Sequence, residues 1–143
     1  MEYIKSCGVI VYKRINDINY FLLIKSINND IGFPKGHLEY GETELETAIR
    51  ELKEETNVSV DIDEGFKKQI EYKLSDKIDT IKIAIYFLGR VISDNIICQI
   101  EEVKEAKFIP YEEALKLLTF VETKELLIEA NEFINLNCKG VLK

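Results

Sequence analysis

The chain has 143 residues, of which 46% are hydrophobic and 31% are charged, with seven glycines and two prolines. This composition is typical of one globular domain, residues 1–143, and excludes collagen and intrinsically disordered chains. Nineteen Lys and Arg residues stand against 26 Asp and Glu residues, and the resulting formal charge of −7 excludes a nonspecific binder of duplex nucleic acid.

The N-terminal part of the chain is rich in strand-forming residues. Residues 6–12 and 20–24 predict two strands, joined in a hairpin across the polar residues 16–19. Residues 28–37 are rich in turn formers, and Pro34 excludes a central strand or a helix interior. We therefore expect a loop between the hairpin and the next element.

Residues 44–56 predict an amphipathic helix. Its apolar residues recur at the spacing of one buried stripe, Leu45, Ala48, Ile49 and Leu52. Thr43 and Glu46 fit a capping box at the start of this helix. Asn57 tolerates the left-handed conformation that often closes a helix. The sequence therefore predicts where this helix begins, which face it buries and where it ends.

Strand and helix patterns continue to the end of the chain. Further strands are expected at 58–60, 66–74, 80–91 and 106–109, the last of them ended by Pro110. Residues 112–118 and 123–135 carry apolar residues at helical spacing. The order of strands, helix, strands and helices predicts the α/β class (α+β), with a mixed β-sheet between helices in an α/β/α sandwich.

Three carboxylates occupy the polar side of the predicted helix 44–56. Glu51, Glu54 and Glu55 are spaced i, i+3 and i+4, so a turn of about 100° per residue gathers them on one edge, away from the apolar stripe. Neighbouring like charges are mildly unfavourable, and a hard cation such as Mg²⁺ would reverse that effect. The simpler alternative is a solvated acidic face that binds no metal.

The residues around these acids form a longer pattern. Residues 36–58 read G-x5-E-x7-R-E-L-x-E-E-x-N-V, with Gly36, Glu42 and Arg50 preceding the acids. This pattern resembles the Nudix box, G-x5-E-x7-R-E-U-x-E-E-x-G-U, in which U is a bulky aliphatic residue. Asn57 replaces the second glycine of the box, and Asn accepts positive φ better than most other residues.

The resemblance implies a Nudix-type α/β/α sandwich and a role for each matched residue. The ligands of Mg²⁺, for which Mn²⁺ can substitute, would be the backbone carbonyl of Gly36 and the carboxylates of Glu51, Glu54 and Glu55. Arg50 would orient the catalytic acids, and Glu42 would be a supporting acid near the site. Among the acids, Glu55 is preferred as both ligand and general base.

Two further stretches, 32–51 and 102–114, look like the branch of the Nudix family that cleaves diadenosine tetraphosphate asymmetrically. That branch has an acid in the loop before the final strand, so Glu102 is carried over as an additional metal ligand or base, with Glu101 and Glu105 as alternatives. The resemblance implies metal-dependent hydrolysis of dinucleoside polyphosphates, with water attacking phosphorus and with ATP and AMP as products.

An acidic protein needs local cations to receive a polyphosphate. Lys35 and His37 lie on either side of Gly36 and can meet a phosphate, although either can simply be a solvated surface group. Tyr72 and Tyr86 lie on predicted strands and are candidates for stacking on a purine base, which contributes about 1–3 kcal/mol per base. Packing within the sheet is the alternative for both tyrosines.

Two other functions stay open at this point. One is a different Nudix activity, on RNA 5′-pyrophosphate, a nucleotide sugar or NADH. The other is a noncatalytic domain that senses nucleotides. In each case the expected partner is a small nucleotide, and we expect a monomer or a weak homodimer.

The cysteines and the apolar segments indicate the compartment. Cys7, Cys98 and Cys138 share no C-x-x-C spacing, so neither a disulfide framework nor a zinc site is expected. No apolar run approaches the ~20 residues of a membrane span, and the N-terminus lacks the basic start of a signal peptide. We therefore expect a cytoplasmic protein that does not enter a membrane.

Overall fold

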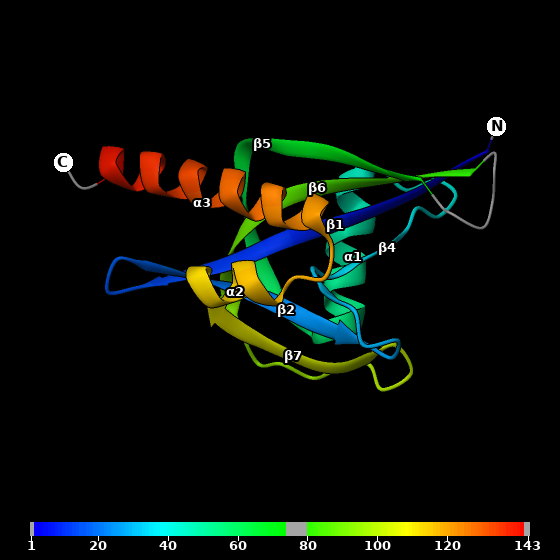
Figure 1. The fold of residues 1–143 in the computed structure, drawn as a ribbon, viewed down its shortest axis with the longest axis horizontal. Coiled ribbons are helices and arrows are strands. Elements are labelled where there is room, and N and C mark those ends of the chain that lie inside the picture. The colour runs from blue at the N-terminus through cyan, green and yellow to red at the C-terminus, as the bar shows by residue number, and fades with distance from the viewer. Residues whose placement is uncertain (1, 74–79, 142–143) are drawn as a thin grey trace.

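The computed structural model describes residues 2–73 and 80–141 (Figure 1). Its strands are β1 (Glu2–Ile15), β2 (Ile18–Ser26), β3 (Ile31–Gly32), β4 (Lys35–His37), β5 (Ser59–Lys73), β6 (Thr80–Ser93) and β7 (Val103–Pro110). Its helices are α1 (Glu44–Thr56), α2 (Tyr111–Leu117) and α3 (Val121–Val141). None of these helices is both long and apolar enough to span a membrane, within the described ranges.

The sheet forks beside its long first strand. β1 pairs in parallel with β6 from Glu2 to Tyr12, and β6 pairs antiparallel with β5. On its other edge, β1 pairs with β4 through residues 6–8 and with β2 through residues 12–15. β2 continues away from β1 and pairs with β7 and β3. The segment that leads into α1 is therefore held in the fork between β1 and β2.

Helices cover both faces of the sheet, and alternate residues of β1 point to opposite faces. Val9 and Val11 belong to the core beneath α1, whereas Ile10 and Tyr12 belong to the core beneath α2 and α3. This alternation is the two-residue period of a strand that is buried on both sides. The mixed sheet and the α/β/α layering predicted from the sequence are confirmed (Figure 1).

The predicted hairpin is confirmed, and its turn has a clear local cause. Asn16 and Asp17 adopt φ values of 51° and 66°, the left-handed region that a tight two-residue turn requires and that Asn and Asp tolerate. The prediction of a plain loop over residues 28–37 is wrong, because the short strands β3 and β4 form there. Their hydrogen bonds go to β1 and β2, so no local pattern marks them.

Helix α1 begins and ends as predicted. Thr43 and Glu46 form both hydrogen bonds of the capping box, and Asn57 adopts φ 64° at the C-terminal end. The predicted buried stripe is wrong at Ile49, whose side chain is 42% exposed, whereas Glu55 is only 4% exposed. Compared with the orientation that the apolar residues predict, α1 is rotated about its axis. The rotation turns Glu55 toward the protein interior and Ile49 toward solvent.

Candidate active site

The candidate site forms where β4 meets α1. The carboxylate of Glu51 lies against the α-carbon of Gly36, and a β-carbon on Gly36 would overlap it. Gly8 on β1 has the same role on the other side, since a β-carbon there would overlap the carbonyl of Pro34 and the side chain of Lys35. These glycines let the strand, the loop and the helix approach closely enough to form one site.

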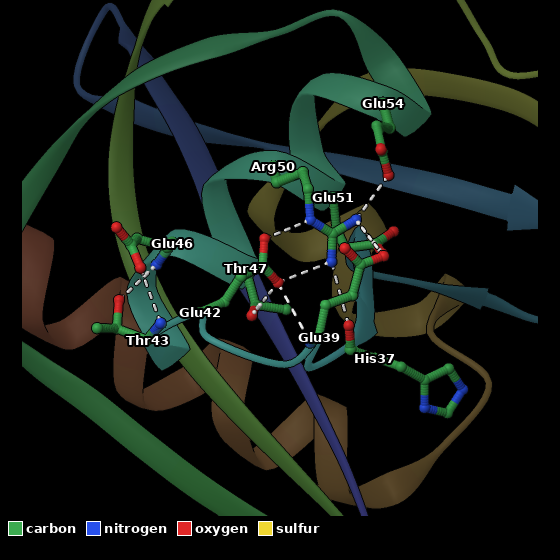
Figure 2. A network of polar contacts seen from close by, with 9 residues as sticks. All are labelled: His37, Glu39, Glu42, Thr43, Glu46, Thr47, Arg50, Glu51 and Glu54. Carbon is green, nitrogen blue, oxygen red and sulfur yellow. Dashed lines mark hydrogen bonds and ion pairs between the residues drawn. The ribbon is translucent and has the colours of Figure 1, made fainter.

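Arg50 connects four neighbours through all five of its N–H donors (Figure 2). Its Nε and Nη2 atoms donate to the two carboxylate oxygens of Glu42, at 2.6 and 3.0 Å. Its Nη1 atom donates to Glu51 at 2.9 Å and to Glu54 at 2.8 Å. The remaining donor binds the backbone oxygen of His37 at 3.2 Å. Arg50 thus holds the carboxylates of Glu51 and Glu54, two of the predicted metal ligands.

Glu42 is held firmly as a charged group. Besides Arg50, its Oε1 atom accepts hydrogen bonds from the Thr47 hydroxyl at 2.8 Å and from the Glu39 amide at 3.2 Å. The hydrogen bonds from Arg50 are the largest cause that lowers the pKa of Glu42 to about 2. Glu42 therefore stays ionised and is the hydrogen-bonded partner of Arg50.

Glu55 occupies a very different environment from Glu54. The Glu54 side chain is 49% exposed and pairs with Arg50, whereas the buried Glu55 accepts a 3.2 Å hydrogen bond from the Lys35 amide. Burial, reinforced by the charges of Glu51 and Glu102, raises the pKa of Glu55 to about 8. Burial also raises the pKa of Glu51. The three box acids are therefore not equivalent, although their spacing alone suggested one shared edge.

A cleft of about 690 Å³ opens beside Glu55. Its walls also include Lys35 and Lys82 together with Asp30, Glu102 and Glu122, so the structure brings two amines and four carboxylates into one space. Burial, followed by the nearby Lys82 amine, lowers the pKa of Lys35 to about 8. The cleft thus combines positive groups that can receive phosphate with acids that can serve as ligand or base.

Aromatic side chains line the same cleft. The rings of Tyr72 and Phe120 meet edge to face with centroids 5.8 Å apart, and Phe120 is 44% exposed. Tyr86 is different, since its side chain is fully buried and its ring packs edge to face against Phe33. Tyr86 also borders the cleft, but its side chain has no exposed surface, and this burial contradicts the expectation that it stacks on a base.

The other predicted residues are divided between the cleft and its surroundings. Of the three candidate acids, Glu102 lines the cleft just before β7, whereas Glu105 lies within β7 and pairs with Lys107 at 3.0 Å. The ring of His37 points away from the Arg50 network in Figure 2, and only its backbone oxygen joins that network. Gly36 lies on β4 beside Glu51 rather than on the cleft wall. The structure therefore supports a phosphate contact for Lys35 more directly than for His37.

Two cleft residues, Lys82 and Phe120, are not among the predicted site residues. Lys82 belongs to β6 and lies far from the Nudix pattern along the chain. The sequence therefore does not reveal that Lys82 is close to Lys35 in the folded protein. Phe120 lies between α2 and α3 and belongs to neither a strand pattern nor a helix pattern of apolar residues that would predict its position in the cleft. An aromatic residue just before a predicted helix is the single signal for it in the sequence.

The donor set fits a hard divalent cation in chemical type. The charge of Glu102 contributes to raising the pKa of Glu51 and of Glu55, so a cation among these three side chains would relieve repulsion between carboxylates. Glu51 and Glu54 each use one oxygen for Arg50, and a carboxylate has lone pairs for further ligands. Among the described residues, however, no three acids, histidines or cysteines are already gathered as a metal site.

Comparison with known proteins agrees with this geometry. Residues 3–130 match the family model described as NUDIX domain. The asymmetrical bis(5′-nucleosyl)-tetraphosphatase of Mus musculus is 32% identical over an alignment that covers 92% of this chain and 95% of that relative.

Solved structures give the same result. A C. elegans Ap4A hydrolase, solved as a binary complex, matches with a TM-score of 0.82 and 27% identity over 92% of this chain and 98% of that chain. The NUDIX domain of Shewanella oneidensis NrtR, solved with ADP ribose, shares the fold, with a TM-score of 0.75 and 16% identity over 94% and 90% of the two chains. The chain therefore belongs to the Nudix family, as a pyrophosphohydrolase related to the asymmetrical Ap4A hydrolases.

Proposed function

We propose that this enzyme hydrolyses dinucleoside polyphosphates with Mg²⁺ or Mn²⁺, and cleaves diadenosine tetraphosphate asymmetrically to ATP and AMP. The observation that carries the proposal is the cleft, where Lys35 and Lys82 lie with Glu55 and Glu102 beside an aromatic wall. Its volume of about 690 Å³ falls within the range of roughly 300–1,000 Å³ that is usual for small-molecule sites. The names of the mouse and C. elegans relatives support the same substrate class.

The metal would be held by the carboxylates of Glu51, Glu54 and Glu55, the carbonyl of Gly36, and Glu102 as a further ligand. When bound, it supplies charge neutralisation at the bridging phosphates and lowers the pKa of a water molecule. Arg50 keeps Glu51 and Glu54 oriented toward this task, and Glu42 keeps Arg50 in place.

Glu55 is proposed as the general base, with Glu102 as the second candidate. A water molecule attacks phosphorus in line with the leaving group, and its proton passes to the carboxylate. The bond between that phosphorus and the bridging oxygen breaks, and the leaving phosphate carries the electron pair away. Burial disfavours the charged form of Glu55, so a bound cation would be needed to keep this carboxylate ionised as the base.

The amines and the rings of the cleft are proposed to bind the rest of the substrate. Lys35 and Lys82 would neutralise phosphate oxygens, with His37, which is not among the residues that line the cleft, as a weaker candidate. The exposed ring of Phe120, braced by Tyr72, would stack on one adenine. The expected cytoplasmic location and the monomeric or weakly dimeric state stay predictions.

Product analysis tests the proposal. Purified protein is incubated with diadenosine tetraphosphate and Mg²⁺, in parallel with triphosphorylated or capped RNA, ADP-ribose, a nucleotide sugar and NADH, with EDTA controls. Equal release of ATP and AMP that EDTA abolishes is the expected result. Faster turnover of another substrate would keep the pyrophosphohydrolase chemistry and overturn the proposed specificity.

A further inference from the structure

Thr47 lies within the polar network of Figure 2, at a position that the Nudix pattern leaves unspecified. Its side chain is fully buried on α1, and its hydroxyl donates a 2.8 Å hydrogen bond to Oε1 of Glu42. A threonine hydroxyl inside a helix commonly bonds back to the carbonyl four residues earlier. Thr56 of the same helix does so, donating to the carbonyl of Leu52 at 2.8 Å. Thr47 instead holds a carboxylate that precedes the helix.

The hydrogen bond from the Thr47 hydroxyl is a rigid one among the hydrogen bonds that hold the Glu42 carboxylate. The Glu39 amide, which also donates to Oε1, belongs to a residue whose side chain is 65% exposed in the segment before the helix. Thr47 is β-branched and completely enclosed, so its hydroxyl has little freedom to move. The position of the Glu42 carboxylate therefore depends on two side chains of α1, the Thr47 hydroxyl and the Arg50 guanidinium.

The effect extends to the predicted metal ligands through the guanidinium of Arg50. That group is planar and rigid, and all five of its N–H donors are in use. A rotation of the Glu42 carboxylate would turn the whole guanidinium and move the nitrogen that holds Glu51 and Glu54. Positions of metal ligands are sensitive to such outer contacts.

We propose that Thr47 is a positioning residue, whose hydroxyl sets, through Glu42 and Arg50, the orientation in which Glu51 and Glu54 are presented to a divalent cation. The inference rests on the metal-ligand roles given under the proposed function, and it does not depend on which nucleotide is the substrate.

Three variants test the proposal. Thr47→Val keeps the branched shape and removes the hydroxyl, Thr47→Ser keeps the hydroxyl, and Thr56→Val removes a buried hydroxyl of the same helix that contacts only backbone. Mn²⁺ affinity is measured without substrate by electron paramagnetic resonance, and kcat and KM are measured at saturating metal.

For Thr47→Val we expect Mn²⁺ affinity and kcat to fall by about tenfold with KM little changed, as for other outer-shell substitutions. Thr47→Ser should stay within about twofold of wild type, and Thr56→Val should keep wild-type Mn²⁺ affinity whatever its thermal stability. Thr47→Val with wild-type Mn²⁺ affinity and kcat would overturn the proposal. If Thr47→Val does not fold, Thr47→Ala replaces it with the same expectation.

A double variant separates positioning from a general packing effect. If Thr47 acts through Glu42, adding Thr47→Val to Glu42→Gln should weaken Mn²⁺ binding no further than Glu42→Gln alone. If the two substitutions each weaken Mn²⁺ binding and their effects multiply in the double variant, Thr47 does not act through Glu42. Mn²⁺ binding is measured without substrate, so the variants can be compared even if none of the tested nucleotides is hydrolysed. A lack of hydrolysis would count against the proposed function but not against the role of Thr47.

Discussion

The Glu51 carboxylate and the α-carbon of Gly36 are in such close contact that no side chain fits at position 36. The two residues come from different elements, since Gly36 is on β4 and Glu51 is on α1. The first glycine of the Nudix pattern therefore has a steric reason in this protein: it leaves the space that the first box glutamate occupies.

Gly36→Ala should displace the Glu51 carboxylate, because the added methyl group takes its place. We expect a loss of kcat of about 100-fold, the size that a misplacement of about 1 Å can cause. Steady-state kinetics and Mn²⁺ binding measure the effect, and circular dichroism checks the fold. A folded Gly36→Ala enzyme with normal kcat would show that Glu51 does not need its observed position.

Glu55→Gln should nearly abolish turnover without unfolding the protein. The substitution keeps the size of the side chain and an oxygen for the Lys35 amide, but it removes the base and the charge. A loss of about 10²- to 10⁴-fold in kcat is expected for a general base. Glu125→Gln on the exposed side of α3 is the matched control and should keep wild-type kcat. The double variant Glu54→Gln/Glu55→Gln must be inactive as well; wild-type turnover by that variant would refute the site assignment.

Glu42 should make the stability of the protein depend on acidity. Its pKa is lowered from 4.5 to about 2, so the folded state gains stability from the ionised form above pH 4.5 and loses it as pH falls through about 2. Urea unfolding measures this effect. At pH 7 the free energy of unfolding should be larger for wild type than for Glu42→Gln, and this difference should shrink steadily below pH 4.5. A difference that is constant from pH 7 to pH 2 would contradict the charged pairing with Arg50.

Phe120→Ala should weaken substrate binding rather than chemistry. A base stacked on an aromatic ring contributes about 1–3 kcal/mol, so KM or the dissociation constant of a nonhydrolysable dinucleotide should rise about 5- to 150-fold with kcat nearly constant. Tyr40→Ala, which removes a fully exposed aromatic ring outside the cleft lining, is the control. Unchanged affinity in Phe120→Ala would remove this ring from the proposed base site.

Much of α1 and its chemistry could be predicted because the relevant interactions are local. The capping box joins Thr43 to Glu46, and the turn at Asn57 depends on its own backbone preference. The box pattern likewise lies within residues 36–58. By contrast, β3 and β4 were missed, since their partners on β1 and β2 lie elsewhere in the chain and their own residues resemble a loop.

The sequence by itself determined the family pattern, the acids that carry it and the helix that presents them, because these features follow from short-range spacing. Only the tertiary structure decided that Glu55 is buried while Glu54 is exposed, since the rotation of α1 depends on how its whole face packs against the sheet. It also decided that Tyr86 belongs to the core and that Lys82 and Phe120 line the cleft. Pairing and packing between distant segments set these positions, and a one-dimensional pattern does not record them.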